Sequence, residues 1–220
     1  MTRSFTAVFL CLIFLLPARA IAAQPSTILV VGDSLSAAYG IDVNRGWVSL
    51  LQRRLKDKGL DHRVVNASIT GDTTRGGLVR LPELLSRFHP RIVVLELGGN
   101  DGLRGLSLEA MGSNLTRMTE LAREAGASVL LLGMRLPANY GQPYGERFHQ
   151  VYRDVAKRTG APLVDFFLEG VAETTRLMQP DGLPPAEAGQ PRMLDNVWQG
   201  LQPLLDHDSL RAEPAAKASG

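Results

Sequence analysis

Short apolar runs alternate with longer helical patterns five times along this chain. The short runs are apolar on both faces, as expected for strands that helices cover on each side. The expected strands are Ile28–Val31, Arg63–Asn66, Ile92–Leu97, Ser128–Leu132 and Pro162–Asp165. The expected helices are about Trp47–Lys58, Gly77–Phe88, Glu109–Glu124, Arg147–Thr159 and Pro185–Leu205.

This alternation of strands and helices predicts a parallel sheet with right-handed crossover connections. We expect a single α/β domain with a three-layer α/β/α (flavodoxin-like) architecture and a five-stranded parallel sheet in the order 2-1-3-4-5. The sequence contains no internal repeat and no domain linker. In this strand order, the switch point at which open α/β sheets bind ligands lies between the first and third strands.

The first residues have the pattern of a secretory signal peptide. A cationic start, Met1–Arg3, precedes the apolar run Phe5–Leu16, and Pro17 and several alanines follow. We expect residues 1–23 to be a signal peptide, so that the mature chain begins near Ala23 or Gln24 and is periplasmic or secreted, without a stable membrane span. A retained membrane anchor is the alternative. Residues 24–207 would form the domain, and the small, polar residues 208–220 a disordered tail.

Cysteine content and charge narrow the classes of function. The only cysteine, Cys11, lies in the expected signal peptide, so the mature chain would have no disulfide and no cysteine-bound metal. No cluster of metal ligands is evident, and we expect no metal and no cofactor. The signal peptide carries Arg3 and Arg19 and no acidic residue, so the formal charge of +2 falls to zero without it. A neutral domain gives no electrostatic reason to expect nucleic acid as a partner. The sequence leaves the oligomeric state open.

Polar residues follow the first three expected strands. They are Gly32-Asp33-Ser34, Asn66 to Asp72, and Gly98-Gly99-Asn100-Asp101. Because the carboxyl ends of parallel strands share one edge of a sheet, these loops should converge, with Ser34 and Asn100 on the two sides of the switch point. A helix expected directly after Ser34 would point its N-terminus at this residue and stabilise negative charge there. By itself, Gly-Asp-Ser after a strand is first of all a turn sequence.

Together these motifs resemble those of a known family. Gly32-Asp33-Ser34-Leu35, Gly71, Gly98-Gly99-Asn100-Asp101 and Asp181-Gly182-Leu183 look like the motifs of the SGNH, or GDSL, hydrolases. The chain is most similar to the bacterial periplasmic thioesterase I, lysophospholipase and arylesterase group, from about Ile28 to Leu205. The resemblance implies a serine hydrolase whose small-molecule substrates are carboxylic esters, acyl thioesters or lysophospholipids.

The resemblance also implies roles for individual residues. Ser34 would be the nucleophile that accepts the acyl group. The backbone N–H groups of Ser34 and Gly71 and the side-chain amide of Asn100 would form the oxyanion hole. Gly71 suits this role because a residue without Cβ lets a substrate approach its N–H group. Taken singly, a turn glycine and a turn-capping amide are the simpler interpretations of Gly71 and Asn100.

The last motif departs from the family pattern Asp-x-x-His. The chain reads Asp181-Gly182-Leu183-Pro184, so Pro184 occupies the position of the general base and Asp181 has no imidazole to orient. Without a base the hydroxyl of Ser34 stays protonated and is a weak nucleophile. We therefore expect an impaired hydrolase, or alternatively a catalytically silent relative that binds acyl or lipid ligands. A nucleotide-binding protein is disfavoured, because no Gly-x-Gly-x-x-Gly and no Walker lysine is present.

Other residues are weak candidates for the missing base. His149 is expected on a solvated helix face, and the remaining histidines are expected at the surface away from the site: His62, His89 and His207. Glu187 begins the last expected helix, where an acidic residue also has a structural explanation.

Two loops are expected to bind the substrate. The loop Gly102–Leu106 follows Asn100 directly, and its glycines permit movement. The loop Met134–Tyr144 follows the fourth strand and carries apolar side chains, which suit an acyl chain. Leu103, Leu136 and Tyr140 are the predicted substrate-binding residues, and ordinary packing of the loop is the alternative.

Overall fold

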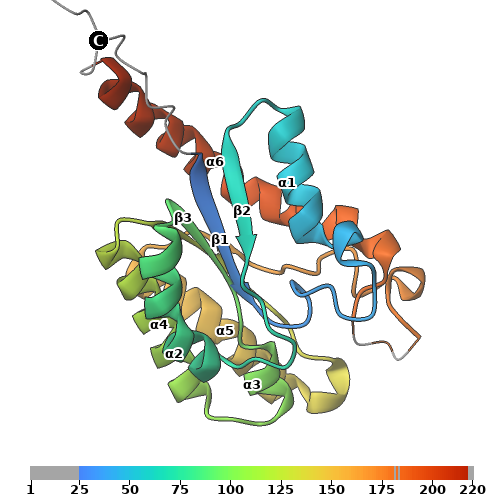
Figure 1. Cartoon of the computed structure of the whole chain (residues 1–220). Helices are drawn as coiled ribbons and strands as arrows, with labels where there is room; N and C mark the ends of the chain where they lie inside the picture. The colour runs from blue at the N-terminus through green and yellow to red at the C-terminus, as the bar shows by residue number, and fades with distance from the viewer. Residues whose placement is uncertain (1–24, 181, 183, 218–220) are drawn as a thin grey trace, which may run out of the picture.

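Five parallel strands form a single sheet in the order β2-β1-β3-β4-β5 (Figure 1). The computed structural model describes residues 25–180, 182 and 184–217, with side chains to residue 208. The predicted fold class and strand order are therefore confirmed. The strands are β1 (Ser26–Gly32), β2 (His62–Asn66), β3 (Ile92–Glu96), β4 (Ser128–Leu132) and β5 (Leu163–Val164).

Helices cover both faces of the sheet (Figure 1). Along β1, Ile28 and Val30 pack toward α1 and α6, whereas Leu29 and Val31 pack toward α2, α4 and α5. This alternation explains why the strands are apolar at consecutive positions. The α-helices are α1 (Trp47–Asp57), α2 (Thr74–Phe88), α3 (Gly99–Leu103), α4 (Leu108–Glu124), α5 (Gln142–Thr159) and α6 (Gln190–Lys217). The short 3-10 helices are η1 (Val43–Arg45), η2 (Ala138–Tyr140), η3 (Thr175–Leu177) and η4 (Glu187–Gly189).

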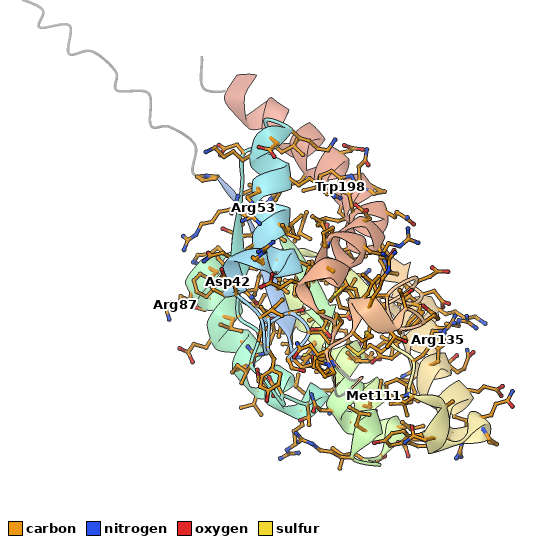
Figure 2. All side chains as sticks on the ribbon, turned by 90° about the vertical axis from the view of Figure 1, so that its right-hand side faces the viewer. Asp42, Arg53, Arg87, Met111, Arg135 and Trp198 are labelled. Atoms are coloured by element: carbon orange, nitrogen blue, oxygen red, sulfur yellow. The ribbon has the colours of Figure 1, made fainter. Side chains whose placement is uncertain are left out.

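The helices α1 and α6 pack side by side on one face of the sheet (Figure 2). Trp47 of α1 and Phe167, which follows β5, meet edge to face beneath them, with ring centroids 5.6 Å apart. On the outside, the guanidinium of Arg54 in α1 lies 5.5 Å from the ring centroid of Trp198 in α6. The helix α6 is thus joined to the domain through both its buried and its exposed face.

The structure corrects two of the predicted helices. No helix directly follows Ser34: residues 34–40 form turns, and α1 begins only at Trp47. The expectation that a helix N-terminus points at Ser34 is therefore wrong. The last helix begins at Gln190 rather than Pro185, because Pro185 forms an antiparallel bridge with Met178. It continues to Lys217, beyond the predicted end at Leu205.

The expected signal peptide, residues 1–23, lies outside the described residues. None of the helices in the described part of the chain is long and apolar enough to cross a membrane. The predicted boundary between domain and tail, at residues 207 and 208, falls within α6 and stays a prediction.

Candidate active site

The loops after β1 and β2 meet at the carboxyl edge of the sheet, as the sequence predicts. Val30 of β1 pairs with Asn66 at the end of β2, and both chains leave the sheet close to this point. The Asn66 side-chain amide donates a hydrogen bond to the Ser36 carbonyl oxygen at 2.8 Å. Ser34 is half-buried in the turn that Asn66 holds. The serine is therefore partly accessible, and the turn that carries it is attached to the end of β2.

Asn100 reaches the same turn from α3. The chain enters α3 at Gly98, whose φ of 119° suits glycine, and a Cβ there would lie 2.3 Å from the Tyr152 hydroxyl. Asn100 Nδ2 donates to Asp33 Oδ2 at 3.1 Å, and Arg104 Nη2 lies 3.4 Å from Asn100 Oδ1. A carboxylate on the nitrogen and a guanidinium on the oxygen together determine the orientation of the amide.

Gly71 is the third element of the predicted oxyanion hole, and Arg104 connects it with Asn100. The φ of Gly71 is +80°, a value that L side chains rarely adopt. Arg104 Nη2 donates to the Gly71 carbonyl oxygen at 2.9 Å, from the same nitrogen that faces Asn100 Oδ1. Arg104 was not predicted to take part, since the contact depends on the end of α3, a helix that the sequence pattern does not indicate.

The main-chain donors of the turn are available for a ligand. Among the described residues, no acceptor is paired with the N–H group of Ser34 or of Gly71. The Ser34 hydroxyl likewise has no hydrogen-bond acceptor among the described side chains. Both residues are half-buried. The arrangement can therefore offer two backbone N–H groups and the amide of Asn100 to an oxygen that becomes negative.

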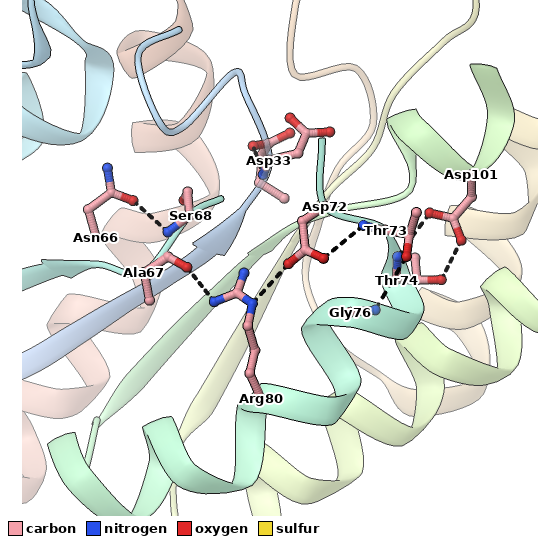
Figure 3. Close-up of polar contacts among 11 residues, drawn as sticks. Asp33, Asn66, Ala67, Ser68, Asp72, Thr73, Thr74, Gly76, Arg80 and Asp101 are labelled. Atoms are coloured by element: carbon pink, nitrogen blue, oxygen red, sulfur yellow. Dashed lines mark hydrogen bonds and ion pairs between the residues drawn. The ribbon is translucent and has the colours of Figure 1, made fainter. Parts of the chain in front are cut away.

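A hydrogen-bond network holds the loop that carries Gly71 against α3 (Figure 3). Asp101 is buried and accepts from the Thr74 backbone N–H at 2.9 Å and from the Thr74 hydroxyl at 2.6 Å. Arg80 of α2 pairs with Asp72 at 2.8 Å and also donates to the Ala67 carbonyl oxygen. The loop after β2 is thus attached to both helices that flank it.

Two buried carboxyl groups, Asp33 and Glu96, lie beneath the turn that begins at Ser34. Glu96 is fully buried, and its Oε2 accepts from the Ser36 hydroxyl at 2.6 Å and from the Asp33 backbone N–H at 3.2 Å. Burial raises the pKa of Asp33 to about 6 and raises the pKa of Glu96 well above its ordinary value. Sequence analysis did not single out Glu96, although a charged residue at the end of an apolar strand was the available signal.

The loop with Pro184 packs on the segment that follows Ser34. Pro184 is buried, and its carbonyl oxygen accepts from the Gln179 backbone N–H at 2.8 Å. The Gln179 side chain donates to the Tyr39 carbonyl oxygen at 2.8 Å. Asp181, predicted to be the acidic partner of the base, and Leu183 lie outside the described residues.

The structure changes the interpretation of two histidines. His62 lies in β2 and His149 in α5, and both are buried, so the expectation of surface positions is wrong for them. The Nδ1 atom of His149 lies 2.9 Å from the Met134 carbonyl oxygen, and its Nε2 atom lies 3.2 Å from Asp165 Oδ2. Both ring nitrogens therefore have partners within the fold, and neither partner is Ser34.

The predicted substrate-binding loops lie against each other. The Tyr140 hydroxyl donates to the Leu103 carbonyl oxygen at 3.1 Å. Leu136 lies against Gly102, where a Cβ would come within 2.9 Å of it. Beside Leu136 is a hollow of about 500 Å³. Its lining is mostly apolar and consists of Arg135, Leu136, Pro137, Ala138, Gly141, Gln142, Gly145, Glu146 and His149.

No three His, Cys, Asp or Glu side chains of the described residues are grouped so that they could hold a metal ion.

Comparison with curated proteins reveals close relatives. The chain is 56% identical over 195 residues to Esterase TesA of Pseudomonas aeruginosa, covering 89% of this chain and 96% of that protein. It is 45% identical over 188 residues to Thioesterase 1/protease 1/lysophospholipase L1 of Escherichia coli, covering 86% and 89%. An arylesterase of Vibrio mimicus is 42% identical over 192 residues, covering 87% and 95%.

Solved structures agree with these relatives. A crystal structure of TesA matches with a TM-score of 0.80 and 57% identity, covering 81% of this chain and 99% of that one. The psychrotrophic esterase EstA from Pseudoalteromonas sp., inhibited by monoethylphosphonate, matches with a TM-score of 0.78 and 39% identity, covering 82% and 99%. The family model described as the GDSL-like Lipase/Acylhydrolase family matches residues 30–192. The chain belongs to this family of GDSL, or SGNH, acylhydrolases.

Proposed function

We propose that this chain is an exported SGNH-type serine hydrolase that cleaves carboxylic esters, acyl thioesters or lysophospholipids through an acyl-Ser34 intermediate. Its turnover is slow, because Pro184 stands where the family has its general base. One observation carries the proposal: the Asn100 amide is held on Asp33, the neighbour of Ser34, beside two unpaired backbone N–H groups.

The proposed reaction begins when Ser34 Oγ attacks the carbonyl carbon of the substrate. The carbonyl oxygen becomes an oxyanion, which the N–H groups of Ser34 and Gly71 and the Asn100 amide stabilise. The tetrahedral intermediate then expels the alcohol or thiol and leaves an acyl-Ser34 ester, which water hydrolyses. In both steps the attacking hydroxyl or water must lose a proton and the leaving group must gain one. With Pro184 in place of an imidazole, solvent has to accept and return that proton, and each step slows.

The hollow beside Leu136 and the relatives support the proposed substrate class. Its lining is mostly apolar, and Leu136 connects it to α3. A volume of about 500 Å³ lies in the range of pockets that hold small molecules. The relatives named above are an esterase, a thioesterase that is also a lysophospholipase, and an arylesterase. All these substrates contain an acyl group. Leu103, Leu136 and Tyr140 bind this group in the proposed complex.

Export follows from the first residues of the sequence. The cationic start, the apolar run Phe5–Leu16 and the small residues after Pro17 direct the chain to the periplasm or beyond. Intact-mass measurement of the protein recovered from the periplasm tests this, and a mass that still includes Met1 to Ala20 contradicts cleavage.

Pro184 supports a second candidate function, the binding of acyl or lipid ligands without turnover. The two functions are separated by assaying the wild-type chain, Ser34→Ala and Pro184→His on a chromogenic butyrate ester and an acyl thioester. We expect slow turnover by the wild type, none above background by Ser34→Ala, and fast turnover by Pro184→His. If all three are inert while a labelled fatty acid binds the wild type, the second function is correct. If the wild type is already fast and Pro184→His changes nothing, another residue serves as the base.

A further inference from the structure

The Glu96 carboxyl group lies in a space that is open only because its neighbour on β1 has no side chain. It ends β3 directly beside Gly32 of β1, its partner in the parallel register. A Cβ on residue 32 would lie 2.6 Å from Glu96 Oε2 and 2.8 Å from the Ser36 hydroxyl oxygen. Gly32 is therefore the residue that allows a carboxyl group to lie under the turn that begins at Ser34.

The hydrogen bonds of Glu96 indicate which of its oxygens carries hydrogen. Its Oε2 already accepts two hydrogen bonds, from Ser36 and from the Asp33 backbone. No N–H or hydroxyl of the described residues reaches Oε1, although this atom is buried. The carboxyl groups of Glu96 and Asp33 lie close enough to interact, and their contact favours a proton on Glu96 over one on Asp33. Two carboxyl groups form a hydrogen bond with each other only if one of them keeps its proton.

The surroundings assign this proton to Glu96. Glu96 is fully buried and has no cationic partner among the described residues, whereas Asp33 also accepts from the Leu35 backbone N–H at 3.0 Å and from Asn100 Nδ2 at 3.1 Å. These two hydrogen bonds stabilise the ionised form of Asp33, and complete burial disfavours the ionised form of Glu96, so Glu96 is the donor of the pair. Three further acidic groups lie around the pair, Asp72, Asp101 and Tyr152, and the charge of Asp72 disfavours a second negative charge there. The guanidinium of Arg104 lies on the other side of the Asn100 amide, against its oxygen.

We propose that Glu96 is a positioning residue, held as a neutral carboxylic acid, whose hydrogen bond fixes the Asp33 carboxylate and thereby orients the Asn100 amide toward the acyl oxygen. This role rests on the proposed function, because the Asn100 amide matters only if Ser34 accepts an acyl group. One N–H of Asn100 Nδ2 is used on Asp33, and the other is left for the oxyanion. A rotated Asp33 would release the first bond, and the amide could then turn away.

Three variants of the full chain test the proposal. Glu96→Gln keeps a neutral donor toward Asp33 and an acceptor toward Ser36, whereas Glu96→Leu removes both. Glu83→Gln makes the same chemical change on an exposed position of α2 and is the control.

The first measurement is the unfolding equilibrium constant of each variant between pH 6.5 and 8.5. The folded chain keeps a proton on Glu96 that the unfolded chain releases above the ordinary pKa of 4.5. Stability of the wild type therefore falls as pH rises, by up to about tenfold in this constant per pH unit for one proton. Asp33, with a pKa of about 6, completes its titration in the lower part of this window, so the slope in the upper part reports on Glu96. We expect Glu96→Gln to flatten this dependence and Glu83→Gln to retain it. An unchanged slope in Glu96→Gln would overturn the neutral state of Glu96.

The second measurement follows the Asn100 side-chain amide by ¹⁵N NMR, with Asn100→Ala used for assignment. We expect slow exchange of the amide hydrogens in the wild type and Glu96→Gln, and faster exchange in Glu96→Leu. Equal exchange in all three would overturn the positioning role. Neither measurement depends on turnover, so both remain decisive if Pro184→His is inert and the proposed function fails.

If Pro184→His is active, kinetics in that background gives a third readout. Glu96→Leu should lower kcat by roughly tenfold to a hundredfold with little change in KM, because the loss of an oxyanion-hole donor itself costs roughly 10²–10³. Glu96→Gln should restore most of the rate. A change in KM alone, or an equal loss of kcat in both variants, contradicts the proposal.

Discussion

The turn that begins at Ser34 has two sides, and hydrogen bonds connect one side to the rest of the fold more extensively than the other. On the oxyanion side, the loops after β1, β2 and β3 are linked by hydrogen bonds through Asn66, Asn100, Arg104 and Asp101. On the base side, the described residues attach the loop to Tyr39 through Gln179 but offer no acceptor to the Ser34 hydroxyl. In the proposed reaction, the part of the site that stabilises negative charge is therefore separable from the part that moves protons.

This difference indicates that the hydrogen bonds which hold the site together do not require a basic side chain at position 184. The oxyanion side consists of strand ends and helix starts that also close the core, so its hydrogen bonds contribute to folding. The loop with Pro184 contributes through its backbone, since the Pro184 carbonyl oxygen and the bridge between Met178 and Pro185 do not involve a side chain at position 184. Position 184 can therefore carry proline in place of the histidine of the family motif with little effect on the fold.

The largest expected effect comes from restoring the base. General acid–base catalysis contributes roughly 10²–10⁴-fold, so Pro184→His should raise kcat for a butyrate ester by about this factor. The gain should require the neutral imidazole and disappear as pH falls below about 6.5, the ordinary pKa of histidine. A pH–rate profile measures both.

Pro184→Ala is the matched control for this gain. It frees the backbone at position 184 without supplying a base, and the carbonyl oxygen that accepts from Gln179 is retained. We expect no gain from alanine. If Pro184→Ala and Pro184→His raise the rate equally, release of the loop rather than proton transfer limits the wild type.

The next largest effect concerns the oxyanion side. In the Pro184→His background, Asn100→Ala should lower kcat by roughly 10²–10³-fold, because it removes one donor to the oxyanion. Asn44→Ala is the control, since Asn44 is exposed and bonds only to Asp42 among the described residues. Steady-state kinetics on the same ester decides, and an Asn100→Ala rate within a few-fold of its parent would remove Asn100 from the oxyanion hole.

The strands were predictable because their signal is local. Consecutive apolar residues identified all five, and polar residues after β1, β2 and β3 indicated the edge at which the site forms. The helix α3 was not predictable in the same way, since Gly99 and Gly102 are poor helix formers. Asp101 holds this helix through Thr74, a contact across 27 positions of sequence.

Glu96 and His149 show the same limit on side chains. The place of Glu96 depends on Gly32 across the sheet, 64 positions earlier in the sequence, and no pattern along β3 reveals that partner. The helical pattern of α5 put His149 on a solvated face, but the segment after β4 covers it through the Met134 carbonyl oxygen. In both residues the decisive neighbour is distant in sequence.

A moderate effect on stability is expected from the network behind Gly71. Thr74→Val keeps the shape of the side chain but removes the hydroxyl that donates to Asp101 Oδ1 and accepts from Asn114 Nδ2. Both partners lose a bond in a buried place, so the free energy of unfolding should fall by about 3 kcal/mol. Thr119→Val, which removes one bond to the Leu115 carbonyl oxygen within α4, should cost about 1 kcal/mol or less. Urea unfolding measures both free energies. Equal losses would mean that the contact of Thr74 with Asp101 stabilises the fold no more than the hydrogen bond of Thr119 within α4 does.

The smallest expected effect tests Asp165, beyond the hollow. Arg153 forms a fork on its two oxygens at 2.7 and 2.8 Å, and this hydrogen bonding, together with His149, lowers the pKa of Asp165 below its usual range. A lowered pKa means that the contribution to stability is present at neutral pH and is lost as pH falls below about 3.8, the ordinary value. The Asp165 side chain is 43% exposed, so solvent screens the ion pair. Asp165→Asn should therefore lower the free energy of unfolding at pH 7 by about 1 kcal/mol or less. The difference from the wild type should shrink below about pH 3.8, because the unfolded wild type then takes up a proton on Asp165 that the folded wild type does not bind. A difference that stays constant from pH 7 to pH 3 would show that packing, rather than charge, makes Asp165 stabilising.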